Sequence, residues 1–387
     1  MRIAVFGGTF NPPHAGHVEA AKAAMSALEA DKLIIIPAGE PPHKPKVEGD
    51  LGAKIRLKLA KLAFAELDKT EVSDIELKRS GASFTVDTLI ELSTKYPKAE
   101  LFLLMGTDMF MSFDTWKDYQ AILKLVTIAA FPRQKGEDLE LNFQCERLKE
   151  KYGARVITID FTPFEISSTE LREKLRKRDG DKLINESVYA EIIKNRYYGA
   201  NPAFSWLREL AYAFMDEKRI PHVMGCESEA IRLAERWGAD KELAAEAGIL
   251  HDITRKLNIY EQLNLCEKYG IVVKDDEKES YKLLHAKTGA ALSRDLFGIS
   301  DDVYAAIYWH TTGRENMSLL EKIIYMADYI EPNRKFAGVD QLRRLSYENL
   351  DKALCLGLRI CVDELNSKAL SVHENTQKAL DWYAEIC

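Results

Sequence analysis

The sequence predicts two domains of different classes: an α/β domain with a doubly wound parallel sheet, followed by an all-α helical bundle. At 387 residues the chain is longer than one hydrophobic core usually supports. Its first half alternates short β-rich runs with longer segments of helical period, which is typical of βαβ units wound into a parallel sheet. Almost everything after residue 200 has helical period instead. We therefore expect domains at residues 1–198 and 199–387.

The strands of the first half are expected where short apolar runs stand between turn residues, because strands buried on both faces have this pattern. Such runs are found at residues 2–6, 32–37, 101–106, 126–131 and 155–159, with a weaker run at 71–74. Apolar residues at helical spacing predict helices between them, at 16–29, 53–66, 85–95, 116–125, 139–152 and 168–178.

The second half has a helical period nearly throughout. Helices are predicted at 204–217, 222–237, 241–251, 281–297, 301–308, 319–330 and 342–347, with a long helical stretch at 350–385. Only residues 270–274 have an extended pattern. The two halves are not repeats of each other, so the sequence predicts two unrelated modules joined by a short tether between Tyr197 and Pro202.

The composition excludes several classes of protein. Hydrophobic residues at 46% and charged residues at 30% are typical of a globular chain rather than a disordered or fibrous one. The net charge of -7 comes without a Lys/Arg block, which argues against binding of nucleic acid or a membrane surface. The six cysteines form no CxxC pair, and no apolar run has membrane-spanning length. We expect a cytoplasmic protein with small-molecule partners; a homo-oligomer stays open.

A phosphate-binding layout follows the first predicted strand. Gly7 and Gly8 let backbone amides approach an anion, and the start of the next helix adds positive potential. His14 and His17 are three residues apart, so at a helix start both can face one ligand. Two imidazoles there can donate to the oxygens of a phosphoryl group that is being transferred. The alternative is a packed strand–loop–helix turn with incidental histidines.

A second candidate segment lies near the end of the α/β domain. It runs Ile166-Ser167-Ser168-Thr169-Glu170-Leu171-Arg172. Ser167 with Glu170 three residues later is a capping box, which by itself explains their spacing. Capping leaves Arg172, one turn further on, unexplained.

Both segments resemble motifs of the nucleotidyltransferase superfamily, HxGH at His14–His17 and ISSTxxR at Ile166–Arg172. This resemblance implies a Rossmann-like nucleotidyltransferase fold. Over about residues 1–197 the chain is similar to bacterial nicotinate-nucleotide adenylyltransferases. The segments that carry this similarity are Pro41-Pro42-His43-Lys44, Ser83–Leu89, Gly106-Thr107-Asp108 and Thr115-Trp116-Lys117.

The resemblance implies adenylyl transfer from ATP to nicotinate mononucleotide with Mg²⁺, which gives deamido-NAD and pyrophosphate. It implies that ATP is bound by Gly8, Thr9, Phe10, His14, His17, Ser167, Ser168, Thr169 and Arg172. It implies that nicotinate mononucleotide is bound by Lys44, Thr85, Asp108, Trp116 and Arg133, and that His14, His17 and Lys44 are catalytic. Arg133 stands where the family usually has Arg-Pro-Gly. Taken alone, Trp116 fits ordinary packing and Lys44 fits a solvated loop charge.

Histidines and aspartates in the second half have a spacing that indicates a metal site. His251 and Asp252 are adjacent, so both can serve one centre only if it is wedged among several helices. Asp328 interrupts an apolar run, where an unpaired carboxylate would be costly to bury and where metal coordination would offset that cost. His222, His285 and His310 complete the set. Each histidine alone fits a structural role, and His373 is interpreted as structural.

The order of these residues resembles the H…HD…D signature of HD phosphohydrolases, and their surroundings resemble the YqeK family of HD-type diadenosine tetraphosphate hydrolases. The resemblance implies a site with two transition metals, a di-iron site, with His222, His251 and Asp328 on one metal and His285 and His310 on the other. It also implies that Asp252 bridges the metals as a catalytic residue, and that diadenosine tetraphosphate is split symmetrically into two ADP. Lys287, Arg255 and Arg314 are candidate phosphate clamps or, alternatively, solvated surface charges.

Two alternatives stay open for the second half. It can be a nucleotide-sensing module that regulates the first half, or a hydrolase of another nucleotide polyphosphate. Each half carries a complete motif set, so we expect residues 1–197 and 202–387 to fold and work separately.

Overall fold

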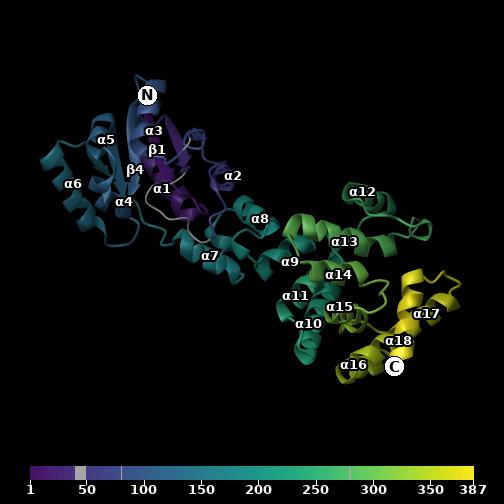
Figure 1. Cartoon of the computed structure of the whole chain (residues 1–387). Helices are drawn as coiled ribbons and strands as arrows, with labels where there is room; N and C mark the ends of the chain where they lie inside the picture. Colours follow the sequence, from purple (N-terminus) through teal and green to yellow (C-terminus); the bar gives the residue numbers. More distant parts are fainter. Residues whose placement is uncertain (40–48, 80, 279) are drawn as a thin grey trace. The chain divides into compact units, whose positions relative to one another are not determined.

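The computed structural model describes residues 1–39, 49–79, 81–278 and 280–387. Within them the chain forms two compact units, Met1–Asn201 and Pro202–Cys387 (Figure 1). The first unit therefore extends three residues beyond the domain boundary expected from the sequence. The short segment after Tyr198 packs with the α/β unit.

The first unit is built on a six-stranded, fully parallel sheet of order β3-β2-β1-β4-β5-β6. The strands are β1 (Arg2–Gly8), β2 (Lys32–Pro37), β3 (Thr70–Val72), β4 (Glu100–Gly106), β5 (Val126–Phe131) and β6 (Val156–Thr158). All six strand predictions are confirmed, including the weak one. The strand order reverses between β1 and β4, and ligands of such sheets bind outside the carboxyl ends of the strands at this point.

Helices surround the sheet as the doubly wound prediction requires. They are α1 (Ala15–Ala27), α2 (Ala53–Ala63), α3 (Thr85–Lys95), α4 (Thr107–Met111), α5 (Tyr119–Leu125), α6 (Asp138–Tyr152), α7 (Ser168–Arg176) and α8 (Glu186–Lys194), with short 3₁₀ turns η1 (Phe113–Thr115), η2 (Asp181–Leu183) and η3 (Tyr197–Gly199). The helix predicted at 116–125 begins only at Tyr119, because Trp116 is extended and Asp118 has a left-handed backbone. Ile3, Val5 and Ile128 point to one face of the sheet, where they share a core with α3, α5 and α6.

The second unit is helical throughout its described residues, which confirms the all-α prediction. Its helices are α9 (Phe204–Ala213), α10 (Ile220–Trp237), α11 (Lys241–Leu250), α12 (Ile259–Tyr269), α13 (Tyr281–Phe297), α14 (Asp301–Trp309), α15 (Leu319–Ile330), α16 (Val339–Glu348), α17 (Leu350–Ser367) and α18 (Glu374–Ile386), with short 3₁₀ turns η4 (Glu217–Arg219) and η5 (Asp275–Glu277). Helix α11 is buried almost all round, with α9, α10, α14 and α15 packed against it. The residues that follow α11 are thereby held inside the bundle.

Three details of the second unit differ from the sequence predictions. The stretch at 350–385 is two helices, because Ala369 has a left-handed φ of 54° and His373 caps α18. Residues 270–274 form no strand, since Gly270 ends α12 with a φ of 65°. Helix α12 itself was not predicted, although the capping box of Asn258 and Glu261 marks its start.

Candidate active sites

The first candidate site lies at the carboxyl ends of β1 and β4. The chain leaves β1 through Gly8 and Thr9, and Phe10 then adopts a left-handed φ of 50° and is buried. The Phe10 ring packs edge-on against Phe64 at 5.7 Å and against His17 at 5.1 Å between centroids. These ring contacts fix the loop that leads to the start of α1.

His14 and His17 lie against each other at the start of α1, with ring centroids 3.7 Å apart. The backbone N–H of His14 donates to Nδ1 of His17 at 3.2 Å, so the proton of a neutral His17 ring is on Nε2. Both ring nitrogens of His14 are buried, and neither has a hydrogen-bond partner among the described residues. Burial, with the positive charge of Arg133, lowers the pKa of His14 to about 3, and burial lowers that of His17 well below its usual value. The pair is neutral and has hydrogen-bonding capacity to offer a ligand.

Gly16 lies between the two histidines, at a position where close contacts leave little room for a side chain. A Cβ atom at this position would lie 3.0 Å from the carbonyl oxygen of Phe164 and 3.1 Å from Nδ1 of His14. A side chain at this position would therefore displace the His14 ring or the backbone at Phe164. Glycine keeps the helix start in contact with both.

The segment that begins α7 is hydrogen-bonded to the loop after β1. Ser168 Oγ donates to the carbonyl of Pro12 at 2.9 Å, and Arg172 donates to the carbonyl of Asn11 at 2.7 Å and to Thr169 Oγ1 at 3.1 Å. Ser167 and Glu170 form the capping box. The family resemblance predicts that this segment binds phosphate, and this stays a prediction. In the structure the segment holds the loop that carries His14.

Asp108 and Arg133 come together at the ends of β4 and β5. They form an ion pair. The Arg133 side chain crosses Gly106, where an added Cβ would lie 2.7 Å from Arg133 Cδ. Arg133 also lowers the pKa of both histidines, so its charge acts on the same site.

Thr85 and Trp116 lie on neighbouring segments. Thr85 is the first residue of α3, and the Lys117 ammonium that follows Trp116 lies 4.2 Å from the centroid of the Phe84 ring. The Trp116 ring is 5.7 Å from that of Phe113 and packs against the core. Lys44, like the rest of its predicted motif, lies outside the described residues.

No sequence motif marks Arg56 as a residue of this site. Its side chain is 1% exposed and donates to the carbonyls of Thr9 at 2.9 Å and Gly39 at 3.0 Å. Arg56 therefore holds the loop after β1 in place through the backbone carbonyl of Thr9. The available signal was its helical position on the same face as the buried Leu59, Ala60 and Ala63.

The second candidate site lies inside the helical bundle, where five helices bring six predicted residues together. These are His222 on α10, His251 and Asp252 just after α11, His285 on α13, His310 just after α14 and Asp328 on α15. They include two sets of potential metal ligands whose donor atoms lie within 4.8 Å of one another, His222–His251–Asp328 and His251–Asp252–His310.

Asp252 faces the histidines with both of its oxygens. Oδ2 lies 3.4 Å from Nε2 of His251 and 3.8 Å from Nε2 of His222. Oδ1 lies 3.1 Å from Nε2 of His285 and 3.9 Å from Nε2 of His310. Asp328 Oδ1 is 3.0 Å from Nε2 of His222. The carboxylate of Asp252 thus stands between two groups of imidazoles.

Backbone carbonyls orient two of the rings. His251 Nδ1 is 2.8 Å from the carbonyl of Gly248, and His310 Nδ1 is 2.7 Å from that of Ile307. Because a carbonyl only accepts, each Nδ1 is the donor, and Nε2 of the neutral ring turns its lone pair into the cluster. Burial and the nearby His285 lower the pKa of His310 to about 3, which keeps that ring neutral.

The cluster fits metal ions. Asp252 is fully buried, and within the described residues its Oδ1 makes no hydrogen bond of good geometry, although Nε2 of His285 lies 3.1 Å away. An ion between Oδ1 and the imidazole nitrogens would satisfy it. Imidazole nitrogens together with carboxylates suit a divalent transition metal better than Mg²⁺. Burial opposes ionisation, but His251 and His285 hold the pKa of Asp252 well below its usual range, so the carboxylate is charged.

Three residues around the cluster were not predicted. Glu331 Oε1 is 3.1 Å from Nδ1 of His222, and a Cβ on Gly225 would lie 2.4 Å from the other Glu331 oxygen. Arg219 pairs with Asp252, and Arg334 donates to Asp328 Oδ1 at 2.6 Å. These groups orient the ligands and balance their charge. Their signal was weak, because single charged residues outside the motif have many possible partners.

Two of the candidate phosphate clamps are paired elsewhere. Lys287 is buried against Glu277 at 2.6 Å, and Arg314 donates to both oxygens of Glu321 at 2.9 and 2.8 Å. His373 lies 3.0 Å from Glu277, which agrees with its structural interpretation.

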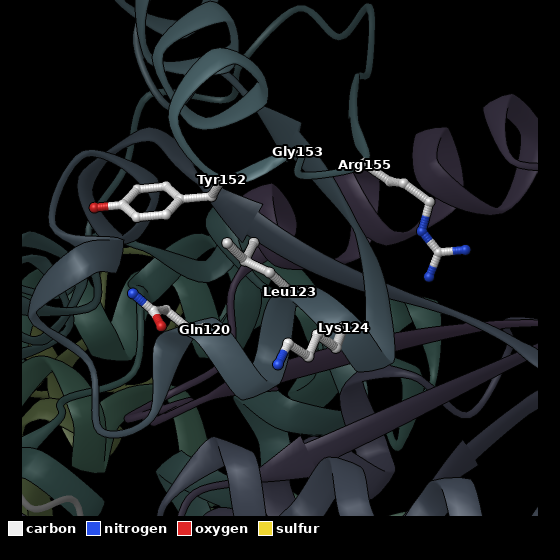
Figure 2. Close-up of a pocket in the computed structure, with 6 residues that line it drawn as sticks. All are labelled: Gln120, Leu123, Lys124, Tyr152, Gly153 and Arg155. Carbon is white, nitrogen blue, oxygen red and sulfur yellow. The ribbon is translucent and has the colours of Figure 1, made fainter.

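A cavity of about 490 Å³ opens elsewhere on the first unit (Figure 2). Its lining is Gln120, Leu123, Lys124, Tyr152, Gly153 and Arg155. These residues precede β5 and β6, so the cavity is at the amino ends of the strands, opposite the histidines.

None of the described helices is long and apolar enough to cross a membrane.

Two known protein families match the chain, one in each half. Residues 5–174 match the cytidylyltransferase-like family, and residues 219–333 match the HD domain. The chain is 29% identical to a Mycoplasma genitalium protein named "probable nicotinate-nucleotide adenylyltransferase/Ap4A hydrolase", over 93% of this chain and 97% of that protein. It is similar, at 37% identity and a TM-score of 0.47, to a solved Clostridium acetobutylicum structure described as a "predicted HD superfamily hydrolase involved in NAD metabolism", over 49% of this chain and all of the other.

A Clostridium tetani protein named "probable nicotinate-nucleotide adenylyltransferase" is 36% identical over 50% of this chain and 98% of its own length. This match covers nearly the whole relative. The chain therefore belongs to the nicotinate-nucleotide adenylyltransferase family and carries an HD domain in its second half.

Proposed function

We propose that the chain is a bifunctional enzyme of the cytoplasm. Its first unit transfers the adenylyl group of ATP to nicotinate mononucleotide, and its second unit hydrolyses diadenosine tetraphosphate to two ADP. The relative that matches almost the whole chain is named for both activities, which supports the pairing. The observation that carries the proposal is the presence of two separate sites, the His14–His17 pair and the cluster around Asp252.

In the first unit, the protein side chains would position the two substrates and neutralise negative charge, and would not act as nucleophiles. The phosphate of nicotinate mononucleotide would attack the α-phosphorus of ATP in line, and pyrophosphate would leave. The Nε2–H of His17 can donate to a phosphate oxygen, and this bond strengthens as negative charge grows there. Mg²⁺ enters as the counterion of ATP and is part of the substrate. Arg133 and Asp108 lie where they can orient the second nucleotide.

In the second unit, the six clustered residues would hold two divalent metals, which we propose to be iron. His222, His251 and Asp328 would serve one ion, His285 and His310 the other, and Asp252 both. Metals in such a site supply Lewis acidity to phosphate hydrolysis. Glu331 and the carbonyls of Gly248 and Ile307 keep the rings turned toward the cluster.

A substrate and metal panel tests this assignment. The first unit should use nicotinate mononucleotide with a higher kcat/KM than nicotinamide mononucleotide, and an equal or better value with the amide would contradict it. The purified chain should contain transition metal and yield ADP as the only nucleotide product from diadenosine tetraphosphate. AMP with ATP as products would mean attack at another phosphorus. Faster cleavage of a different nucleotide polyphosphate would replace the substrate, and binding without cleavage would favour a sensing module.

A further inference from the structure

Tyr198 lies at the end of the first unit, and its side chain contacts the loop after β1 that leads to the first candidate site. It belongs to η3, four residues before Pro202 begins the second unit. Its hydroxyl donates to Oδ1 of Asn11 at 2.9 Å, and both side chains are buried, with 5% and 4% exposed. Asn11 lies three residues before His14 in the loop after β1. A residue 187 positions away in sequence thus contacts the loop that carries a proposed catalytic histidine.

Asn11 is held from two directions. Tyr198 fixes its side chain, and Arg172 fixes its backbone carbonyl at 2.7 Å. The next carbonyl, that of Pro12, accepts from Ser168 at 2.9 Å. Among the described contacts to this loop, those of Ser168 and Arg172 go to its backbone, whereas that of Tyr198 goes to the Asn11 side chain.

Tyr198 itself has little freedom. Its carbonyl accepts from Arg176 Nε at 2.9 Å. Asn201 fastens the following residues to the end of α7, through its backbone N–H to Leu175 at 2.9 Å and its side chain to Arg176 at 3.1 Å. Burial raises the pKa of the Tyr198 phenol well above its usual value, so the hydroxyl stays protonated as a donor. The hydrogen bond therefore joins two fixed segments.

We propose that Tyr198 is a positioning residue of the first active site, which sets the Asn11 side chain and through it the loop that presents His14. The inference rests on the proposed adenylyl transfer. It means that the transferase site is completed by a residue next to the tether, after all of the motifs that define the family resemblance.

The experiment is a double-mutant cycle in the full chain. Tyr198→Phe removes only the hydroxyl, and Asn11→Ala removes its acceptor. Tyr198→Phe should weaken ATP binding or lower kcat for adenylyl transfer about five- to tenfold, the effect of one neutral hydrogen bond. In the Asn11→Ala background the same change should have almost no further effect, because the two residues act through one contact. Tyr197→Phe, the same change one residue earlier, is the matched control and should behave as the unmodified chain.

Calorimetric ATP binding, steady-state transfer and hydrolysis of diadenosine tetraphosphate are measured on each preparation. An unmodified chain that binds ATP but transfers to neither mononucleotide would refute the proposed function, while ATP binding would still report on Tyr198. Normal ATP binding and normal transfer by Tyr198→Phe would overturn the inference. So would additive effects of the two changes, or a parallel loss of hydrolysis, since these would mean general destabilisation.

Discussion

His222 and His251 face each other with their Nε2 atoms 3.3 Å apart. Nδ1 of His222 is directed at the carboxylate of Glu331, and Nδ1 of His251 at the carbonyl of Gly248. Both acceptors bind the Nδ1 proton, so in neutral rings two Nε2 lone pairs would face each other inside a buried cluster and repel. A cation between them removes this repulsion, and Asp328 and Asp252 lie close enough to share it.

Metal removal is therefore expected to destabilise the second unit. An ion that binds only the folded cluster adds about 2.7 kcal/mol to the free energy of unfolding at a free concentration about 100 times its Kd. Scanning calorimetry of the chelated chain, with and without added Fe²⁺ or Mn²⁺, measures this. The transition of the second unit should move to higher temperature with metal and that of the first should not. Identical scans would contradict a metal site at these residues.

Glu331→Gln should lower the metal affinity of the cluster while the second unit stays folded. The carboxylate orients His222, and loss of such an outer partner typically costs about 10- to 100-fold in metal affinity. Competition with a calibrated chelator gives the affinity. Glu321→Gln is the matched control, because Glu321 is equally buried but pairs with Arg314 away from the cluster. Equal losses in both variants would assign Glu331 a merely structural part.

The pH dependence of transfer should show no step near pH 6.5 from His14 or His17. The pKa of His14 is lowered to about 3 by burial and by Arg133, with Glu170 acting in the opposite direction, and that of His17 is also lowered, so both rings stay neutral above pH 5 or so. Between these values and about pH 6.5 the unfolded chain binds protons that the folded chain does not, so stability falls as the pH is lowered through this window. Rate–pH profiles and denaturant titrations test both parts. A rate that follows one protonation at about 6.5 would contradict neutral histidines.

The activity and stability of an isolated first unit should depend on the residue at which the fragment ends. A fragment of residues 1–201 keeps Tyr198 and Asn201, whereas 1–197 loses the donor to Asn11 and the bonds to the end of α7. We expect 1–201 to transfer adenylyl groups like the full chain. These contacts revise the expectation from the sequence that 1–197 works by itself, and we expect that fragment to be weaker in activity and stability. Parallel assays and thermal melts of the two fragments decide this. Equal behaviour would show that the last residues of the unit are dispensable.

The fold was predictable because its signals are local. Buried strands such as 32–37 and 126–131 are apolar runs, and their bounds match the structure. The break before α18 was missed because the left-handed residue there is alanine rather than glycine. The cluster around Asp252 was predicted by resemblance, because its members stand in motifs. Tyr198, Arg56 and Arg219 were not, since each acts through contacts with residues distant in the sequence, which no motif records.

Crosswise inactivation tests the central claim most directly. His17→Ala and Asp252→Ala are introduced separately into the full chain, and both reactions are assayed on the same preparations. His17→Ala should lower adenylyl transfer by about 10²-fold or more, as loss of a preorganised donor does, and leave hydrolysis of diadenosine tetraphosphate intact. Asp252→Ala should lose bound metal and hydrolysis together and leave transfer intact. Loss of both activities in either variant, or hydrolysis that survives without Asp252, would contradict two independent active sites.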